Sequence, residues 1–385
     1  MDNKKRQGDE VIMSILTEAS IKKSVPKLGF GMMRLPMKGE DIDREQVNQM
    51  VDHYMDSGMN YFDTALFYHG GKSEGVLKEA VVKRYPRESF TVADKMPIWE
   101  VNEPADVEKI FNTQLERCGV EYFDYYLLHA LDGDKNKKCE EMGAYEFCLR
   151  MREEGKIKSF GFSFHGTTAD IKHILANHGS EFEFVQLQIN YYDWEFDYKE
   201  QYEITRSYDL PIVVMEPVRG GFLAKMPKEI EASFKAFHPE MSIASWALRW
   251  VTSLEGVIIS LSGMSNMEQL VDNVSYMKDF KPLTEAENAV VEQAVKLLLE
   301  APIIPCTDCK YCIECPMEIP IFDIFAVYNG EFINKKSLGD FKKNYNEFDS
   351  NSNAAACVAC GFCEPLCPQN IPIIEKLADI AALTE

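Results

Sequence analysis

The sequence predicts a TIM (β/α)8 barrel followed by a small domain that carries two runs of cysteines. Short apolar segments of strand length alternate with amphipathic stretches between residues 27 and 301, which is the pattern of an α/β barrel. None of these strands opens into a G-x-G-x-x-G turn, which disfavours a doubly wound sheet. Eight of the eleven cysteines lie in the last eighty residues, which predicts a second domain with chemistry of its own.

Eight candidate strands justify the barrel. They are 27–32, 60–63, 90–93, 125–128, 159–162, 184–188, 212–215 and 257–261. Helices are expected between them, because apolar residues recur there every three or four positions. One such stripe contains Val47, Met50, Val51 and Tyr54, and a second contains Val107, Ile110, Phe111 and Leu115. The charged segment 132–140 is expected to be a solvated loop.

The chain is longer than one hydrophobic core usually serves. It has 385 residues, of which 46% are hydrophobic, so we expect two domains. An N-terminal extension is expected at residues 1–20, the barrel at residues 21–299 and the cysteine-rich domain at residues 300–385.

Charge and hydropathy exclude some partners. The net charge of −21 argues against nucleic acid and anionic membrane surfaces. No stretch is long and apolar enough to span a bilayer. The chain opens with polar residues such as Asp2, Lys4 and Arg6 rather than with an apolar signal segment. These features predict a protein of the reducing cytoplasm that binds neither nucleic acid nor membrane.

Two runs of four cysteines have the spacing of iron-sulfur ligands. They are Cys306, Cys309, Cys312 and Cys315, and Cys357, Cys360, Cys363 and Cys367, each closed by a proline. Steps of C-x-x-C place successive thiolates around one cluster without straining the backbone. Disulfides would need an oxidising compartment, and zinc ribbons usually separate their cysteine pairs by a longer gap. The runs therefore predict two 4Fe-4S clusters.

The spacing of these runs resembles that of two-cluster ferredoxins. The gap of about forty residues between them is similar to the all-helical dicluster ferredoxin domain of larger oxidoreductases, over about residues 302–385. In two-cluster ferredoxins the fourth cysteine of each run ligates the other cluster. The expected ligand sets are Cys306, Cys309, Cys312 and Cys367 for one cluster, and Cys357, Cys360, Cys363 and Cys315 for the other. The three remaining cysteines, Cys118, Cys139 and Cys148, are expected to be buried structural thiols.

Polar residues gather at the predicted strand ends. Barrel enzymes place their catalytic groups at the carboxyl ends of their strands. The side chains at or just past such ends are Asp63, Lys95, His129, Ser163, Gln186, Gln188, Glu216 and Ser262. Any one of them could be an ordinary loop residue, but their recurrence on successive strands predicts a catalytic rim.

The segments that carry these residues resemble the aldo-keto reductase family. The similar segments are 29–36, 63–68, 124–129 and 216–221, together with Lys95 at the end of the third strand. Segment 63–68 has the family's Asp-Thr-Ala-x-x-Tyr pattern. The resemblance extends over about residues 24–299, and the C-terminal ferredoxin domain is similar to that of the family's iron-sulfur branch.

This resemblance implies a catalytic tetrad of Tyr68, Lys95, Asp63 and His129. Reduction of a carbonyl by hydride needs a proton donor for the developing alkoxide, and Tyr68 can serve if its high pKa is lowered. The ammonium of Lys95 would favour the tyrosinate, and Asp63 would keep that lysine charged. His129 would orient the substrate oxygen or assist the proton relay.

The resemblance also implies a nicotinamide cofactor, NADP(H) or NAD(H), at the barrel rim. Ser163 and Gln186 would hold its carboxamide, and Met215 would pack against its ring. Arg219 and Gly220 would approach its pyrophosphate, because arginine pairs with phosphate and glycine permits close contact. The remaining expected contacts are Gly31, Met32, Ser262, Ser265, Gln269 and Asn273.

Two positions leave the choice of nicotinamide cofactor open. The basic residues that grip the 2'-phosphate of NADPH in the family correspond to Gly263 and Gln269 in this chain. Neither side chain carries a positive charge. The sequence therefore does not separate NADPH from NADH.

The expected function is that of an oxidoreductase that reduces a carbonyl, or oxidises an alcohol, with a nicotinamide cofactor. Two 4Fe-4S clusters are expected to be coupled to this reaction or to stabilise the protein. A hydride carries two electrons whereas a cluster passes one, so the two sites do not exchange electrons directly. A flavin, in the barrel or on a partner protein, could divide the pair, or an external ferredoxin could supply the clusters. The alternative is an electron-transfer protein whose barrel serves mainly for docking.

Overall fold

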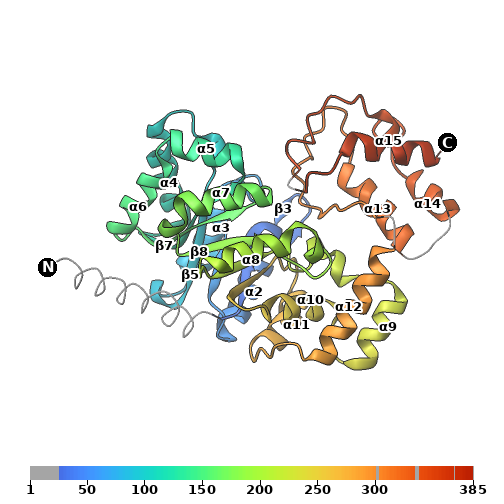
Figure 1. Ribbon diagram of the computed structural model, residues 1–385, viewed down its shortest axis with the longest axis horizontal. Coiled ribbons are helices and arrows are strands. Elements are labelled where there is room, and N and C mark those ends of the chain that lie inside the picture. The colour runs from blue at the N-terminus through green and yellow to red at the C-terminus, as the bar shows by residue number, and fades with distance from the viewer. Residues whose placement is uncertain (1–25, 301–302, 334–337, 368, 385) are drawn as a thin grey trace. The chain divides into compact units, whose positions relative to one another are not determined.

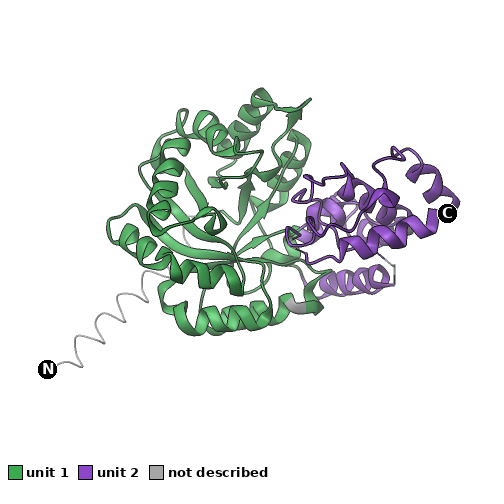
Figure 2. Cartoon of the chain, turned by 90° about the horizontal axis from the view of Figure 1, so that it is seen from above, with its two compact units in different colours: residues 1–217, 248–283 green, residues 218–247, 284–385 purple. Residues whose placement is uncertain are grey.

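The structure is a computed structural model that describes residues 26–300, 303–333, 338–367 and 369–384. The chain forms two compact units, which Figure 2 shows in different colours. The barrel unit comprises the residues up to Pro217 and Leu248–Leu283, and the cysteine unit comprises Val218–Ala247 and Thr284–Glu385. The extension expected at residues 1–20 lies outside the described residues.

Eight parallel strands close into a barrel in the order β1-β10-β9-β8-β7-β6-β5-β4, which confirms the predicted fold (Figure 1). They are β1 (Leu28–Gly31), β4 (Tyr61–Asp63), β5 (Thr91–Met96), β6 (Phe123–Leu131), β7 (Ile157–Phe164), β8 (Phe184–Gln188), β9 (Ile212–Met215) and β10 (Val257–Ser262). Each strand overlaps the segment predicted for it. Because all eight are parallel, their carboxyl ends meet at one rim. Outside the barrel, β2 (Met37–Lys38) and β3 (Asp41–Ile42) form a short antiparallel pair.

The strands are apolar because both of their faces are buried. One buried cluster draws on most of the strands and contains Tyr61, Ala93, Tyr125, Leu127, Phe184, Val213, Ile259 and Leu261. Gly29 of β1 faces this cluster closely. A Cβ atom at this position would lie 2.6 Å from Leu261 Cδ2 and 2.9 Å from Ile259 Cγ2, so the packing requires glycine.

Helices connect the strands of the barrel unit. They are α2 (Arg44–Asp56), α3 (Ser73–Leu77), α4 (Pro104–Cys118), α5 (Gly133–Glu141), α6 (Ala144–Glu153), α7 (Thr168–His178), α8 (Lys199–Ser207) and α11 (Met267–Met277), and α10 (Ile243–Thr252) spans the boundary between the units in the sequence. The stripe predicted on α2 is fully buried. On α4, Gln114 is buried in place of Leu115, because its amide donates to Lys95 O at 2.9 Å and accepts from Tyr126 Oη at 2.5 Å.

The expectation of a solvated loop at residues 132–140 is wrong, because this segment forms most of α5. Asp132 caps the helix: its Oδ1 accepts a hydrogen bond from Lys135 N at 2.8 Å. Asn136 and Cys139 form the buried side of the helix, while its charged residues cover the other side. Cys118 and Cys148 are also buried and free, which confirms the prediction that the three isolated cysteines are buried thiols.

In its described residues the cysteine unit is all-helical, as the ferredoxin resemblance predicts. Its helices are α9 (Lys228–Phe237), α12 (Glu285–Leu299), α13 (Ile321–Ile333), α14 (Leu338–Tyr345) and α15 (Ile373–Thr384). A small core holds the cysteine-rich part together and includes Ile304, Ile324, Phe325, Phe341, Tyr345, Leu377 and Ile380. Asn329 of α13 fixes the backbone just before the first cysteine run. Its Oδ1 accepts from Ile304 N at 2.8 Å, and its Nδ2 donates to Ile304 O at 2.7 Å.

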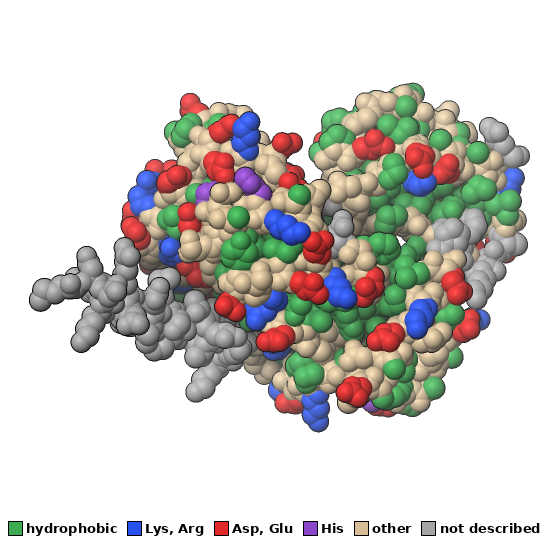
Figure 3. Space-filling view, in the orientation of Figure 1, with side chains coloured by type: hydrophobic (Ala, Val, Ile, Leu, Met, Phe, Trp, Pro, Cys, Tyr) green, Lys and Arg blue, Asp and Glu red, His purple; other side chains and the backbone are tan. Residues whose placement is uncertain are grey.

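Figure 3 shows one face of the molecule with its side chains coloured by type. On the face of the barrel unit in Figure 3, acidic and basic side chains are interspersed. Exposed apolar side chains occur near both cysteine runs, and they are Tyr311, Ile313, Val358, Phe362 and Leu366. Across the described residues, none of the helices combines the length and the apolar character that crossing a membrane requires.

Candidate functional site

A buried ion pair lies at the carboxyl end of β4 and β5. Lys95 Nζ donates to Asp63 Oδ1 and to Thr64 O, at 2.7 Å in both cases. The Lys95 side chain is 0% exposed and that of Asp63 is 3% exposed, so water does not screen their charges. The lysine is therefore held in one place by the ends of two neighbouring strands.

The two other tetrad residues lie beside this pair. Lys95 Nζ is 5.1 Å from the centre of the Tyr68 ring, and the rings of Tyr68 and His129 are 6.3 Å apart. Trp99 follows β5 and packs against His129 at 5.0 Å, and Phe67 packs against Trp99 at 5.7 Å. The structure thus brings all four predicted catalytic residues together and adds an aromatic wall that is partly exposed.

The structure raises the pKa of Tyr68, contrary to the expected lowering. Burial, the largest effect, raises the pKa of Tyr68 well above its ordinary value, and nearby carboxylates, Asp63 first, act in the same direction. Tyr68 is therefore protonated at neutral pH, which is the form that can donate a proton.

His129 is neutral at neutral pH. Burial lowers its pKa well below the ordinary histidine value, and the positive charge of Lys95 lowers it further. In the part of the chain that is described, His129 Nδ1 is buried without a hydrogen-bond partner. A neutral imidazole in this position has one nitrogen that donates and one that accepts, so it can bind a substrate oxygen.

Behind Lys95 lies a polar cluster that the sequence did not predict. Glu74 and Asp94 are both 0% exposed, and burial raises the pKa of each, with Asp94 affected more strongly. Arg117 Nε lies 2.5 Å from Glu74 Oε2, and the Cys118 thiol donates to Asp94 at 3.5 Å. The sequence signal that could have indicated this cluster is Asp94 itself, a charged residue in the largely buried strand β5. The cluster fixes the backbone that carries Lys95.

The expected nicotinamide contacts lie at the rim of the barrel unit. Ser163 Oγ accepts from Ala130 N at 2.7 Å, and Gln186 Nε2 lies 3.5 Å from Met215 Sδ. Within the described ranges, the buried Gln186 Oε1 has no hydrogen-bond partner. Gly31, the last residue of β1, lies close to the backbone of Ser262. A Cβ atom at Gly31 would lie 3.3 Å from Ser262 O. The unpaired Gln186 oxygen fits the carboxamide of a nicotinamide.

The expected adenosine contacts are organised by α11. Asn273 Nδ2 donates to Ser262 Oγ at 2.9 Å, and Gln269 Oε1 accepts from Ser265 N at 2.7 Å. Arg34 was not predicted as a contact, yet its stem covers Gly263, where a Cβ atom would lie 3.0 Å from Arg34 Cδ. Of the other predicted positions, Met32 is fully buried at the end of β1, and its carbonyl accepts from Ser73 Oγ at 3.1 Å.

Arg219 and Gly220 fall in the cysteine unit. Gly220 has φ +63°, and a Cβ atom there would overlap the carbonyl group of Thr307 in the first cysteine run. Arg219 is 1% exposed. The pyrophosphate role expected for these two residues stays a prediction, and their observed surroundings are those of the cysteines.

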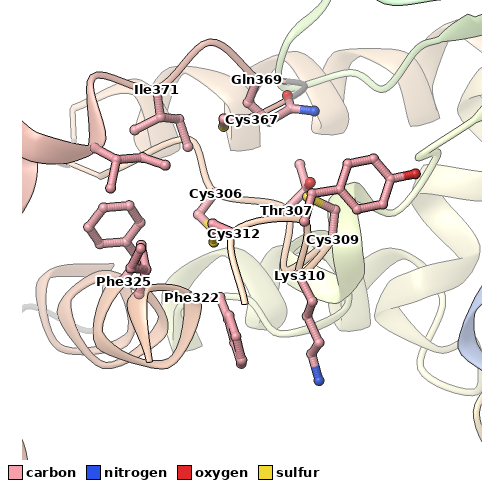
Figure 4. Close-up of a pocket in the computed structure, with 13 residues that line it drawn as sticks. Cys306, Thr307, Cys309, Lys310, Cys312, Phe322, Phe325, Cys367, Gln369 and Ile371 are labelled. Carbon is pink, nitrogen blue, oxygen red and sulfur yellow. The ribbon is translucent and has the colours of Figure 1, made fainter. Parts of the chain in front are cut away.

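Four cysteines line one cavity of the cysteine unit. Cys306, Cys309 and Cys312 of the first run meet Cys367 of the second run around it, as Figure 4 shows. The wall is completed by apolar side chains such as Phe325 and Ile371. These are the four thiols expected to share a cluster, and four sulfurs around one hollow with an apolar lining fit a 4Fe-4S group.

Three of the remaining thiols, Cys315, Cys357 and Cys363, interact with one another. The pKa of the Cys363 thiol is raised to about 11, first by burial, and the neighbouring Cys315 and Cys357 also raise it. Cys306 and Cys312 interact instead with Cys367. The cavity contains one of the two expected ligand sets, and the crossed assignment as a whole stays a prediction.

Comparisons with known proteins match both parts of the chain. A model of the aldo/keto reductase family matches residues 27–296, and a model of a 4Fe-4S dicluster domain matches residues 305–372. A probable aldo-keto reductase of Glycine max is 28% identical over 306 residues, which covers 68% of this chain and 85% of the relative. The aldo-keto reductase yakc [NADP(+)] of Schizosaccharomyces pombe is 30% identical over 162 residues, which covers 39% and 46%.

Solved structures share the barrel fold. An aldo-keto reductase from Bacillus halodurans, in its holo form, has a TM-score of 0.56 at 23% identity and covers 70% of this chain and 92% of its own. An aldo-keto reductase from Klebsiella pneumoniae, in complex with NADPH, has a TM-score of 0.56 at 21% identity and covers 70% and 90%. At these identities, the likeness shows the fold alone.

Proposed function

Because the chain belongs to the aldo/keto reductase family, we propose that it reduces a carbonyl compound, or oxidises the corresponding alcohol, with NADP(H). The observation that carries this proposal is the assembled tetrad, in which Tyr68 and His129 lie beside the buried pair of Lys95 and Asp63. NADP(H) is favoured because a structural neighbour was solved with NADPH and a relative's name includes NADP(+).

A bound NADPH would supply a hydride to the carbonyl carbon. The protein supplies the proton: Tyr68, which is protonated at neutral pH, donates it to the carbonyl oxygen. Lys95 then stabilises the tyrosinate that remains, because its ammonium lies over the Tyr68 ring and is held there by Asp63. Neutral His129 orients the same oxygen by a hydrogen bond.

The aromatic wall supports a substrate with a flat, apolar group next to its carbonyl. Phe67 is 43% exposed and Trp99 is 37% exposed, and both lie on the His129 side of the tetrad. Aromatic side chains of this kind stack on rings and exclude water from one face of a bound molecule. We therefore propose an aromatic aldehyde or ketone as the substrate class.

The cysteine unit would hold two 4Fe-4S clusters, with the crossed ligand sets that the sequence suggests. Such clusters supply one-electron transfer when they are bound. Because a hydride carries two electrons, a flavin or a flavoprotein or ferredoxin partner would have to connect this unit with a nicotinamide reaction. The exposed apolar side chains beside the cysteine runs support contact with a protein partner.

Replacement of Tyr68 by Phe tests the reductase proposal. The variant keeps the ring but loses the proton donor, so kcat/KM for reduction of 4-nitrobenzaldehyde should fall by about 10²–10⁴-fold. The measurement is anaerobic NADPH oxidation, with iron content determined on the same samples. Tyr122→Phe is the matched control, since Tyr122 precedes β6 at the opposite end of the strand and should leave turnover unchanged. Equal turnover in Tyr68→Phe and wild type would favour the alternative of an electron-transfer protein.

A further inference from the structure

One turn of the cysteine unit packs directly on the first cysteine run. The turn η7 (Arg219–Ala224) begins with three successive residues of positive φ: Arg219 at 50°, Gly220 at 63° and Gly221 at 95°. Gly220 approaches Thr307 so closely that a Cβ atom would overlap the Thr307 carbonyl and lie 3.0 Å from its Cα. Thr307 itself lines the cavity between Cys306 and Cys309. Backbone contact therefore fixes this turn against the cavity wall.

The contact places a buried positive charge beside the cysteines. Arg219 is 1% exposed, and its Cζ lies 5.1 Å from the ring centre of Phe222. Arg219 precedes Gly220 in the chain and Thr307 follows Cys306, so the Gly220–Thr307 contact brings the turn that carries Arg219 against the first cysteine run. A charge that is removed from water is screened weakly, so its effect on nearby charged groups is large.

We propose that Arg219 raises the reduction potential of the 4Fe-4S centre held by Cys306, Cys309, Cys312 and Cys367. This inference rests on the ligand set in the proposed function, and it assigns Arg219 a role other than the pyrophosphate contact implied by the family resemblance. Arg219 does not ligate iron in this scheme. It acts through its charge on a centre that four neighbouring thiolates bind.

The physical reason is the change of charge on reduction. One electron and no proton are added to the centre, so with four thiolates its net charge changes from about −2 to about −3. A one-electron reductant, dithionite in the test below, supplies the electron. A fixed positive charge stabilises the more negative state more strongly, which makes reduction more favourable. In this proposal Arg219, about ninety positions before the first cysteine run in the sequence, sets the reduction potential of the 4Fe-4S centre.

Lys310 provides an internal comparison. It carries the same charge and lines the same cavity, and its Nζ lies 5.2 Å from the ring centre of Phe322. Unlike Arg219, it is exposed to solvent. Water and salt screen an exposed charge, so Lys310 should have little effect on the potential.

Anaerobic redox titration with dithionite, followed by electron paramagnetic resonance, tests the proposal on the full-length protein. Arg219→Gln should decrease the equilibrium constant for reduction of this centre by about tenfold, which corresponds to about 59 mV for one electron. Arg219→Lys keeps the charge and should stay within about twofold of wild type, as should Lys310→Gln. A Cys309→Ser variant identifies which signal belongs to this centre.

Three results would overturn the proposal: a shift of less than about twofold in Arg219→Gln, an equal shift in Lys310→Gln, or loss of half the iron in Arg219→Gln. The last result would make Arg219 a structural residue. Iron and sulfide analysis of the wild-type protein separates this failure from that of the proposed function. A wild-type chain without about eight irons would refute the two-cluster assignment itself, and the inference with it.

Discussion

The barrel site and the cysteine site differ in how completely the protein builds them before a cofactor binds. At the barrel rim, Lys95 and Asp63 are buried and paired at 2.7 Å, on regular strands. The cysteines lie in loops between helices, and burial raises the pKa of Cys312 to about 12 and that of Cys306 and Cys363 to about 11. These thiols are protonated at neutral pH without a metal.

The difference shows that the two sites take their stability from different sources. Backbone hydrogen bonds of the barrel hold the tetrad, and the charges of the tetrad compensate each other. In the proposed function, the thiols of the cysteine unit become ligands when iron replaces their protons, so iron binding would contribute to folding there. Perturbing the tetrad should therefore change barrel stability, and perturbing a thiol should change iron content.

The largest effect is expected from breaking the buried ion pair. Asp63→Asn leaves the charge of Lys95 buried without its counterion, which should lower the free energy of unfolding of the barrel unit by about 3–5 kcal/mol. The measurement is urea unfolding followed by near-ultraviolet circular dichroism. Lys172→Gln is the control, because it breaks the ion pair between the half-exposed side chains of Lys172 and Glu200. It should lower the free energy of unfolding by about 0.2–1 kcal/mol.

Iron content should distinguish the two sites in this experiment. Both variants should keep the iron of the wild-type protein, because neither residue is in the cysteine unit. A cost for Asp63→Asn no greater than that of Lys172→Gln would mean that the tetrad is not held by its buried charges, and the comparison would fail on the barrel side.

A second test removes one thiol from the shared cavity. Cys367→Ala should reduce iron from about eight to about four per chain, since one 4Fe-4S ligand set becomes incomplete. The control Cys139→Ala, a buried thiol in the barrel unit, should keep all of it. Iron analysis and electron paramagnetic resonance of the reduced protein provide the measurement.

The same experiment tests the crossed ligation. The signal lost in Cys367→Ala should be the one lost in Cys309→Ala, because both thiols line one cavity. If it were instead the signal lost in Cys363→Ala, each run would bind its own cluster. That result would contradict the grouping seen in the structure.

The smallest effect concerns pH and belongs to the barrel unit. His165 takes up a proton near its ordinary pKa of 6.5 in the unfolded chain, but burial lowers its pKa to about 4 in the folded protein. Between these values the unfolded state binds more protons, so stability falls as the pH decreases below about 6.5 and does not depend on His165 above it. From pH 7.5 to 5.5 the loss should be roughly 1 kcal/mol.

His165→Gln should remove this part of the pH dependence. Thermal unfolding of the barrel unit at pH 7.5 and 5.5 would measure it as the difference in Tm between wild type and variant. Unchanged pH dependence in the variant would show that His165 can take up its proton in the folded barrel. His129, whose pKa is also lowered by burial, would contribute to the slope that remains.

Much of the fold and of the site could be predicted from local sequence patterns. All eight barrel strands were found, because short apolar segments between amphipathic helices are a property of neighbouring residues. The tetrad was inferred from the resemblance of segments 63–68 and 124–129, together with Lys95, to the aldo-keto reductase family. The prediction of a loop at residues 132–140 was wrong. The segment is highly charged and α5 buries only Asn136 and Cys139, so its sequence shows no apolar stripe.

Other features depend on contacts between residues far apart in the sequence. The sequence by itself determined the barrel and the two cysteine runs, since periodicity and spacing encode them, and the family resemblance supplied the predicted tetrad. Only the tertiary structure decided that Glu74 and Asp94 share a buried cluster, that burial raises the pKa of Tyr68, and that the turn carrying Arg219 packs on the first cysteine run. The reason is that burial and electrostatic interactions depend on which distant segments the fold brings together, and no local pattern records that proximity.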